Sequence, residues 1–194
     1  MAPRQTNTRQ QIVDHARNLV QCCGFDGFSY RDIANPLGIR NAAIHYHFPC
    51  KGDLGVAVLE DWLHDLEQEI TVARERRLPP VRQVDEFFIR SEQESAEGWK
   101  VCPFGALSIN HEQLPVAMQE LLIAIRRTIH RWLTENLEAG RKAGTIHFTG
   151  SADTKALQLA AAIQGARQIS KVMEKNVVTE VANQLRDELF HKAT

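Results

Sequence analysis

The stretch "GFDGFSYRDIANPLGIRNAAIHYHFPCKGDL", residues 24–54, decides the fold because it holds two short helices and the turn between them. Ser29, followed three residues later by Asp32, approximates a capping box and predicts that a helix begins there. Gly38 breaks this helix, and a second one is expected over residues 41–48, where a proline follows. The pattern predicts a helix–turn–helix with glycine in the turn.

The second of these helices has two different faces. Ile44 and Phe48 lie one turn apart and are expected to be buried, while His45, Tyr46 and His47 add three rings that form hydrogen bonds. A short helix after such a turn fits the major groove of DNA, about 12 Å wide. Hydrogen-bonding rings on its outer face would hold phosphates. The alternative is that they are ordinary surface residues.

The rest of the chain also has helical periodicity. A first helix is expected from about Thr8 to Cys23, with Cys23 in its apolar stripe and Gly24 at its end. Beyond Lys51 the helices are longer, and strand-type alternation is nearly absent, so the fold class is all-α. The later helices are expected from near Gly52 to an interruption at 74–80, then over about 81–94, 115–139, 151–173 and 177–191, with a loop at 138–150 that has a possible brief extended segment.

Composition places the chain among globular proteins. It has 194 residues, 43% hydrophobic and 24% charged, and lacks any apolar run of the roughly 18 residues needed to span a bilayer. The polar first eleven residues do not resemble a signal peptide, so a cytoplasmic protein with reduced cysteines is expected. Net charge is −1, but residues 1–54 hold six Lys or Arg against four Asp or Glu. This small basic excess is a hint of a DNA-binding end.

Residues 24–54 closely resemble the DNA-binding domain of the tetracycline-repressor (TetR) family. The resemblance covers about a quarter of the chain and implies an all-helical transcriptional regulator. It implies a DNA-binding domain at 1–54 and a helical ligand-binding and dimerisation domain at 55–194. The matching residues are Gly24-Phe25, Ser29, Ile33-Ala34, Gly38, His45-Tyr46, Phe48 and Lys51.

By matching position, the resemblance implies which residues contact double-stranded operator DNA. Three residues depart from the family pattern: His45 stands where a tyrosine is usual, Arg40 where a small residue is usual, and Pro36 where proline is absent. His45 could still donate to a phosphate, and Arg40 could add a base contact. The expected phosphate contacts are Ser29, Tyr30, Arg31, His45, Tyr46, His47 and Lys51, and the residues expected to face base edges are Arg40, Asn41, Ala42 and Ala43.

The resemblance also implies a pocket for a small-molecule effector in the carboxy-terminal domain, although aromatic residues there could equally form core. No cofactor, metal site or enzymatic motif is expected. Cys102, in an irregular stretch near Lys100, could instead be a reactive thiol, as in the N-ethylmaleimide-responsive branch of the family, or an inert buried one. The candidate pocket residues are Trp62, Phe87, Phe88, Trp99, Cys102, Phe104, His111, Met118 and Trp132.

The last two helices suggest a homodimer through residues 151–192. Small residues along the first of them, such as Ala160, Gly165 and Ala166, would let a second backbone approach closely. The alternative is that both apolar stripes close the core of a single chain. The resulting prediction is a repressor that an effector releases from a palindromic operator. The competing prediction is a repressor controlled by thiol modification at Cys102 without a reversible ligand.

Overall fold

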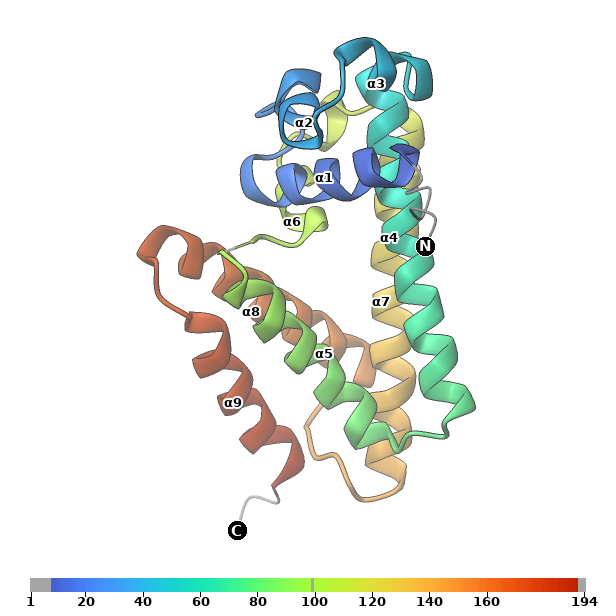
Figure 1. Cartoon of the computed structure of the whole chain (residues 1–194). Helices are drawn as coiled ribbons and strands as arrows, with labels where there is room; N and C mark the ends of the chain where they lie inside the picture. The colour runs from blue at the N-terminus through green and yellow to red at the C-terminus, as the bar shows by residue number, and fades with distance from the viewer. Residues whose placement is uncertain (1–7, 99, 192–194) are drawn as a thin grey trace, which may run out of the picture. The chain divides into compact units, whose positions relative to one another are not determined.

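The structure is a computed structural model, and it describes residues 8–98 and 100–191. All regular secondary structure in these residues is helical, which confirms the all-α prediction (Figure 1). The helices are α1 (Thr8–Cys23), α2 (Tyr30–Leu37), α3 (Asn41–His47), α4 (Lys51–Glu75), α5 (Pro80–Ala96), α6 (Pro103–Leu107), α7 (Val116–Lys142), α8 (Ala152–Met173) and α9 (Val177–Phe190), with a 3-10 turn η1 at His111–Gln113.

The end of α7 differs from the sequence prediction. The helix was expected to end near Ala139, but it continues through Gly140 to Lys142, and no strand follows within 143–150. A Cβ atom on Gly140 would lie 2.4 Å from Cδ1 of Ile146, so this glycine lets the segment after α7 pack closely against the helix. The helix ends instead near Gly144, whose φ of +69° is the left-handed conformation that glycine adopts without strain.

The described chain divides into two compact units. The first comprises residues up to Asp65 together with Pro103–Ala124, so it contains α1 to α3, most of α4, α6 and the start of α7. A Cβ atom on Gly55 would lie 2.5 Å from Sδ of Met118, which shows how closely these two segments approach. Side chains of this unit that are buried almost completely include Ile12, Val13, Ala16, Val20, Ile33, Ile44, Phe48, Leu54, Val58, Leu59, Leu107, Met118 and Leu122.

The second unit comprises Leu66–Cys102 and the residues from Ile125 onward. Its apolar core joins α5, α7, α8 and α9 through residues such as Phe88, Leu133 and Leu159. The domain boundary expected between residues 54 and 55 concerns independent folding and function, and it remains a prediction. The compact units show only that residues beyond 54 pack with the amino-terminal helices.

Ion pairs connect the helices of the second unit. Nη1 of Arg167 lies 2.7 Å from a carboxylate oxygen of Glu94, and Nε of Arg90 lies 2.9 Å from the other. Burial alone would raise the pKa of Glu94, but Arg167 and Arg90 lower it below its usual value. Arg186 of α9 binds both Asp85 and Glu92 of α5. These contacts fix α8 and α9 against α5.

Candidate nucleic-acid interface

The start of α2 is fixed by the predicted capping box. The carboxylate of Asp32 accepts hydrogen bonds from the backbone N–H and from the hydroxyl of Ser29, both at 2.7 Å. These bonds lower the pKa of Asp32, the hydroxyl contributing most and the backbone next. Because the Ser29 hydroxyl already donates to Asp32, donation to a DNA phosphate would have to replace this bond.

The turn between α2 and α3 depends on Gly38, as predicted. Its φ is +64°, and its N–H donates to the carbonyl of Asn35, while the next N–H donates to the carbonyl of Ala34. Pro36 lies inside α2 near its end and does not prevent the helix from reaching Leu37. The two short helices therefore form the expected helix–turn–helix (Figure 1).

Helix α3 is anchored to the core on one face and exposed on the other. Ile44 and Phe48 are buried as predicted. The hydroxyl of Tyr30 donates to the carbonyl of Phe48 at 2.9 Å, and its ring contacts the ring of His45 with centroids 4.8 Å apart. Burial raises the pKa of Tyr30 to about 12, and Cys50 and Asp53 add to the increase. Tyr30 thus ties the start of α2 to the end of α3.

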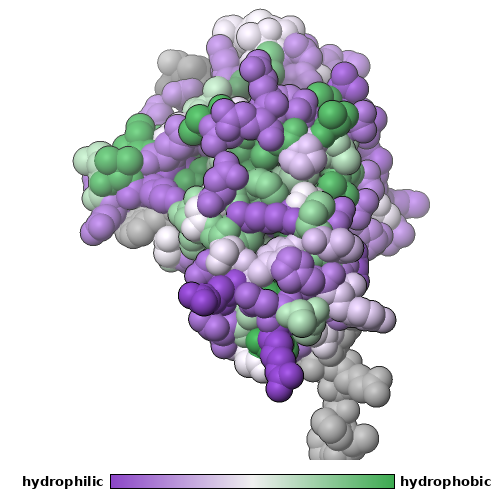
Figure 2. Space-filling model, turned by 90° about the horizontal axis from the view of Figure 1, so that it is seen from above, coloured by the Kyte–Doolittle hydropathy of each residue, from purple (hydrophilic) through white to green (hydrophobic). Residues whose placement is uncertain are grey.

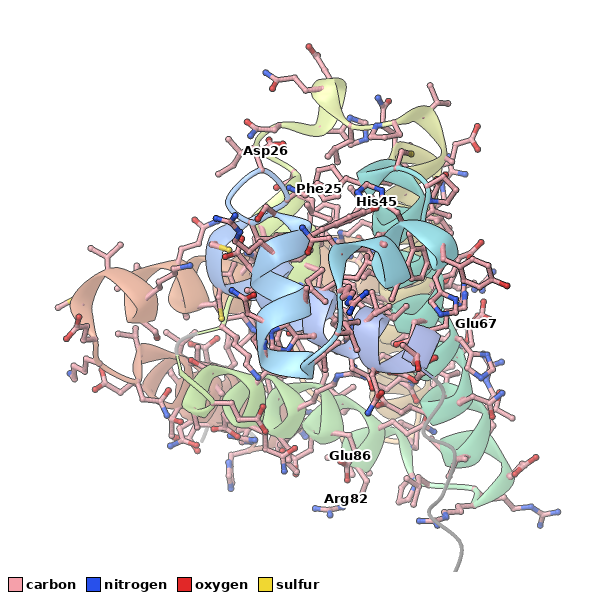
Figure 3. All side chains as sticks on the ribbon, turned by 45° about the horizontal axis from the view of Figure 1, so that its top comes forward. Phe25, Asp26, His45, Glu67, Arg82 and Glu86 are labelled. Carbon is pink, nitrogen blue, oxygen red and sulfur yellow. The ribbon has the colours of Figure 1, made fainter. Side chains whose placement is uncertain are left out.

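The structure brings the eleven predicted DNA-contact residues together within the first unit. Asn41 and His45, one turn apart on α3, are both exposed, and Tyr46 is 84% exposed. Figure 3 shows His45 on α3, and in the view of Figure 2 hydrophilic and apolar side chains are interspersed. The exposed residues of the predicted set are Ser29, Arg31, Arg40, Asn41, Ala42, His45 and Tyr46, and those partly buried are Tyr30, Ala43, His47 and Lys51.

Lys51 has a protein partner that the sequence did not predict. Its ammonium donates to the carbonyl of Phe28 and lies over two rings, 4.2 Å from the centroid of Phe28 and 5.0 Å from that of Phe25. Burial lowers the pKa of Lys51, and the nearby charge of Asp26 opposes the decrease. Nothing in the sequence spacing of the two phenylalanines links them to Lys51. Its phosphate contact remains a prediction.

The candidate pocket residues divide between the two units. Trp62, Phe104, His111 and Met118 belong to the first unit, whereas Phe87, Phe88, Cys102 and Trp132 belong to the second, and Trp99 lies outside the described residues. A cavity of about 170 Å³ is present in the first unit, between the α1–α2 loop and the segment from α6 to Leu114. None of the nine candidates lines it, so the effector pocket remains a prediction.

Cys23 is exposed, so its predicted place in the core is wrong. It is the last residue of α1 and lines the cavity just described together with Phe25 and Asp26, which Figure 3 shows on the loop after α1. Because the cavity is open at this position, no side chain of the described residues covers the carboxy-terminal end of the apolar stripe of α1. Cys102 is partly buried, and none of the cysteines forms a disulfide.

No described helix has the length and apolar character required to cross a membrane. In residues 8–98 and 100–191, no three His, Cys, Asp or Glu side chains are grouped so that they could hold a metal ion.

Comparison with known proteins gives a consistent result. Residues 12–58 match the model of bacterial regulatory proteins of the tetR family. The chain is 25% identical over 163 residues to the HTH-type transcriptional repressor DhaR of Mycobacterium sp. (strain GP1), covering 84% of this chain and 81% of DhaR. A TetR-family regulator from Agrobacterium tumefaciens has 26% identity and a TM-score of 0.86, with coverage of 94% and 97%. The reduced form of NemR from E. coli has the same fold, at 19% identity, a TM-score of 0.76 and coverage of 97% and 100%.

Proposed function

Because the chain belongs to the TetR family of bacterial regulatory proteins, we propose that it is a repressor that a small-molecule effector releases from a palindromic operator. The observation that carries this proposal is the exposed polar face of α3, supported from behind by Ile44 and Phe48. We assign the chain no enzymatic activity, since the relatives it resembles are transcriptional regulators.

The two classes of DNA contact have different chemistry. Arg40 caps the amino end of α3 and Asn41 is its first residue, so both lie at the end of a recognition helix that usually contacts bases. Arginine pairs with guanine and asparagine with adenine in the major groove, while Ala42 and Ala43 offer apolar contact to a thymine methyl. Arg31, His45, Tyr46 and the other predicted phosphate contacts would set the register without reading sequence.

We propose that the repressor is a homodimer through the helices within 151–192. Large apolar side chains exposed on α8 support this assignment, because a second copy would remove them from water. Leu157 and Ile169 are each 48% exposed, and Val172 and Met173 continue this surface at the end of the helix. In such a dimer the two α3 helices would reach successive major grooves, roughly 34–36 Å apart. The effector would favour a form of the dimer in which the distance between the two α3 helices does not match the distance between these grooves.

A footprint on the DNA upstream of the gene tests the proposal. We expect purified protein to protect two symmetric half-sites about one helical turn apart. Arg40→Ala and Asn41→Ala should each weaken specific binding by roughly 5- to 150-fold, corresponding to about 1–3 kcal/mol per bidentate contact. Arg127→Ala, a change at an exposed position on α7, is the control. Failure to bind any fragment at low ionic strength under reducing conditions would overturn the proposal.

A second candidate function is thiol sensing at Cys102, favoured by the charge of Arg126 beside it. The two groups interact electrostatically, and a neighbouring cation favours the reactive thiolate form of a cysteine. Mild treatment with N-ethylmaleimide followed by mass spectrometry should then modify Cys102 first and release the operator. Earlier modification of the exposed Cys22 or Cys50 would exclude this function.

A further inference from the structure

Polar atoms without partners are concentrated along one side of α7. Nη1 of Arg126, Nδ1 of His130 and Oγ1 of Thr134 are buried and have no hydrogen-bond partner in the described residues. The three residues are four apart, so their side chains lie above one another on one face of the helix. Two further atoms of this kind in the same unit are Nε2 of Gln164 on α8 and Oγ of Ser95 on α5.

The face of α7 that carries Arg126 is directed toward the core of the second unit. Leu133 and Leu137 follow it by seven and eleven residues, which at 3.6 residues per turn places them in nearly the same direction. Both are completely buried in this core. Arg127 and Arg131, on the other side of the helix, are exposed. Arg126 is partly buried, unlike these two, and its Nη1 atom is buried.

Arg126 differs from the other inward-facing arginines of this unit. Arg167, only 5% exposed, pairs with Glu94, and Arg186 pairs with two carboxylates. Arg126 forms no ion pair with any carboxylate of the described residues, and burial lowers its pKa, an effect that Cys102 opposes. Arg126 is partly buried, and a guanidinium that is partly removed from water without a carboxylate partner favours an anion from outside the chain.

The neighbouring groups limit the class of anion. His130 contacts a carboxylate oxygen of Asp153 through Nε2 at 2.7 Å, so a second negative group near this end of the site would be repelled. Leu133 and Leu137, which point in nearly the same direction from α7, are buried in the apolar core and add no charge. One guanidinium neutralises one negative charge.

We propose that Arg126 is the anion-binding residue of the effector site and that the effector is a small organic acid whose single carboxylate pairs with its guanidinium. Thr134 and His130 would lie alongside the ligand on the same helix face. The proposal rests on the proposed function for the role of the ligand as effector. Binding of the acid itself does not depend on DNA, so the two can be tested separately.

The first test measures binding by calorimetry and thermal unfolding with three acid and amide pairs: acetate and acetamide, benzoate and benzamide, octanoate and octanamide. At least one acid should bind and stabilise the protein, whereas its neutral amide should not. Arg126→Met keeps the volume and removes the charge, and it should weaken binding of that acid by at least about tenfold. Arg127→Met, the exposed neighbour, should bind like the unmodified protein.

A second readout does not depend on the choice of acid. Without ligand, Arg126→Met should unfold at the same temperature as the unmodified protein or higher, because an unpaired charge has been replaced by an apolar side chain. A clear decrease would show that Arg126 has a structural partner and would overturn the proposal. So would failure of all three acids to bind, or equal binding of acid and amide.

Mobility shifts on operator DNA then separate the two proposals. An acid that binds through Arg126 and releases the DNA supports both. An acid that binds through Arg126 but leaves the DNA complex unchanged shows an anion site and excludes the effector role. Absence of DNA binding by the unliganded protein contradicts the proposed repressor and leaves the calorimetric result standing.

Discussion

The hydrogen bond from Tyr30 to the carbonyl of Phe48 gives a prediction that can be followed over a wide range of pH. In Tyr30→Phe the ring and its contact with His45 remain, but the donor to a partly buried carbonyl is lost. A bond of this type contributes about 1 kcal/mol, so the free energy of unfolding should decrease by about that amount. For a protein of this size, the unfolding temperature should decrease by roughly 2–4 °C.

The pKa of Tyr30 predicts how this difference depends on pH. Its value rises from 10.0 to about 12 on folding, so the protonated phenol is favoured in the folded state. The contribution of Tyr30 to stability is therefore fully present below pH 10 and is lost as the pH rises toward 12. Urea unfolding at successive pH values should show Tyr30→Phe less stable than the unmodified protein at pH 7, and the two converging at high pH.

Tyr46→Phe is the matched control, because Tyr46 is 84% exposed. The chain has two tyrosines, so Tyr46→Phe leaves Tyr30 as the only one, and its ionisation can be followed directly by ultraviolet absorbance. We expect a midpoint near 12. An unchanged unfolding temperature in Tyr30→Phe, or a stability difference that does not shrink with pH, would refute the assignment of the hydrogen bond.

Three further predictions concern stability and DNA binding. Lys51→Met should lower the free energy of unfolding by about 1 kcal/mol, because its hydrogen bond to Phe28 and its contact with the Phe28 ring are lost. If the salt dependence of DNA binding is the same in this variant, Lys51 does not contact a phosphate. Glu94→Gln should destabilise the protein by about 3 kcal/mol in urea unfolding, because Arg167 loses its charged partner. Folding lowers the pKa of Glu94, so the stability that its carboxylate provides should be fully present at any pH above the ordinary pKa of a glutamate. That stability should be lost as the pH falls through the lowered pKa of the folded state. Gly140→Ala should destabilise the protein by about 1–3 kcal/mol despite the higher helix propensity of alanine, and Ile146→Val in the same chain should restore part of the loss.

Features that depend on neighbours in the sequence were predicted correctly. The capping box of Ser29 and Asp32 and the left-handed turn at Gly38 depend on residues within a few positions of each other. Such signals can be recognised in a short stretch of sequence because the backbone conformation they require is local. The helix end near Gly140 was wrong for the complementary reason. The partner that explains this glycine, Ile146, packs against it only after the chain has turned back.

Contacts between distant residues were not predictable in the same way. The Cys23 side chain follows the apolar periodicity of α1, but its exposure depends on the cavity formed with residues near 106–114. That Arg126 forms no ion pair with the described carboxylates is likewise a property of how the helices pack. An arginine among leucines in a helical sequence is read as a surface residue until the buried face is known.

The predicted DNA contacts therefore separate into two groups with different physical roles. Arg31, Arg40 and Asn41 are exposed, so their replacement should weaken DNA binding and leave the stability of the free protein unchanged. Tyr30 and Lys51 donate to backbone carbonyls that hold the ends of α2 and α3 in place. Their replacement should lower stability first and affinity as a consequence. Measuring both quantities for each variant distinguishes a residue that touches DNA from one that positions the helix touching it.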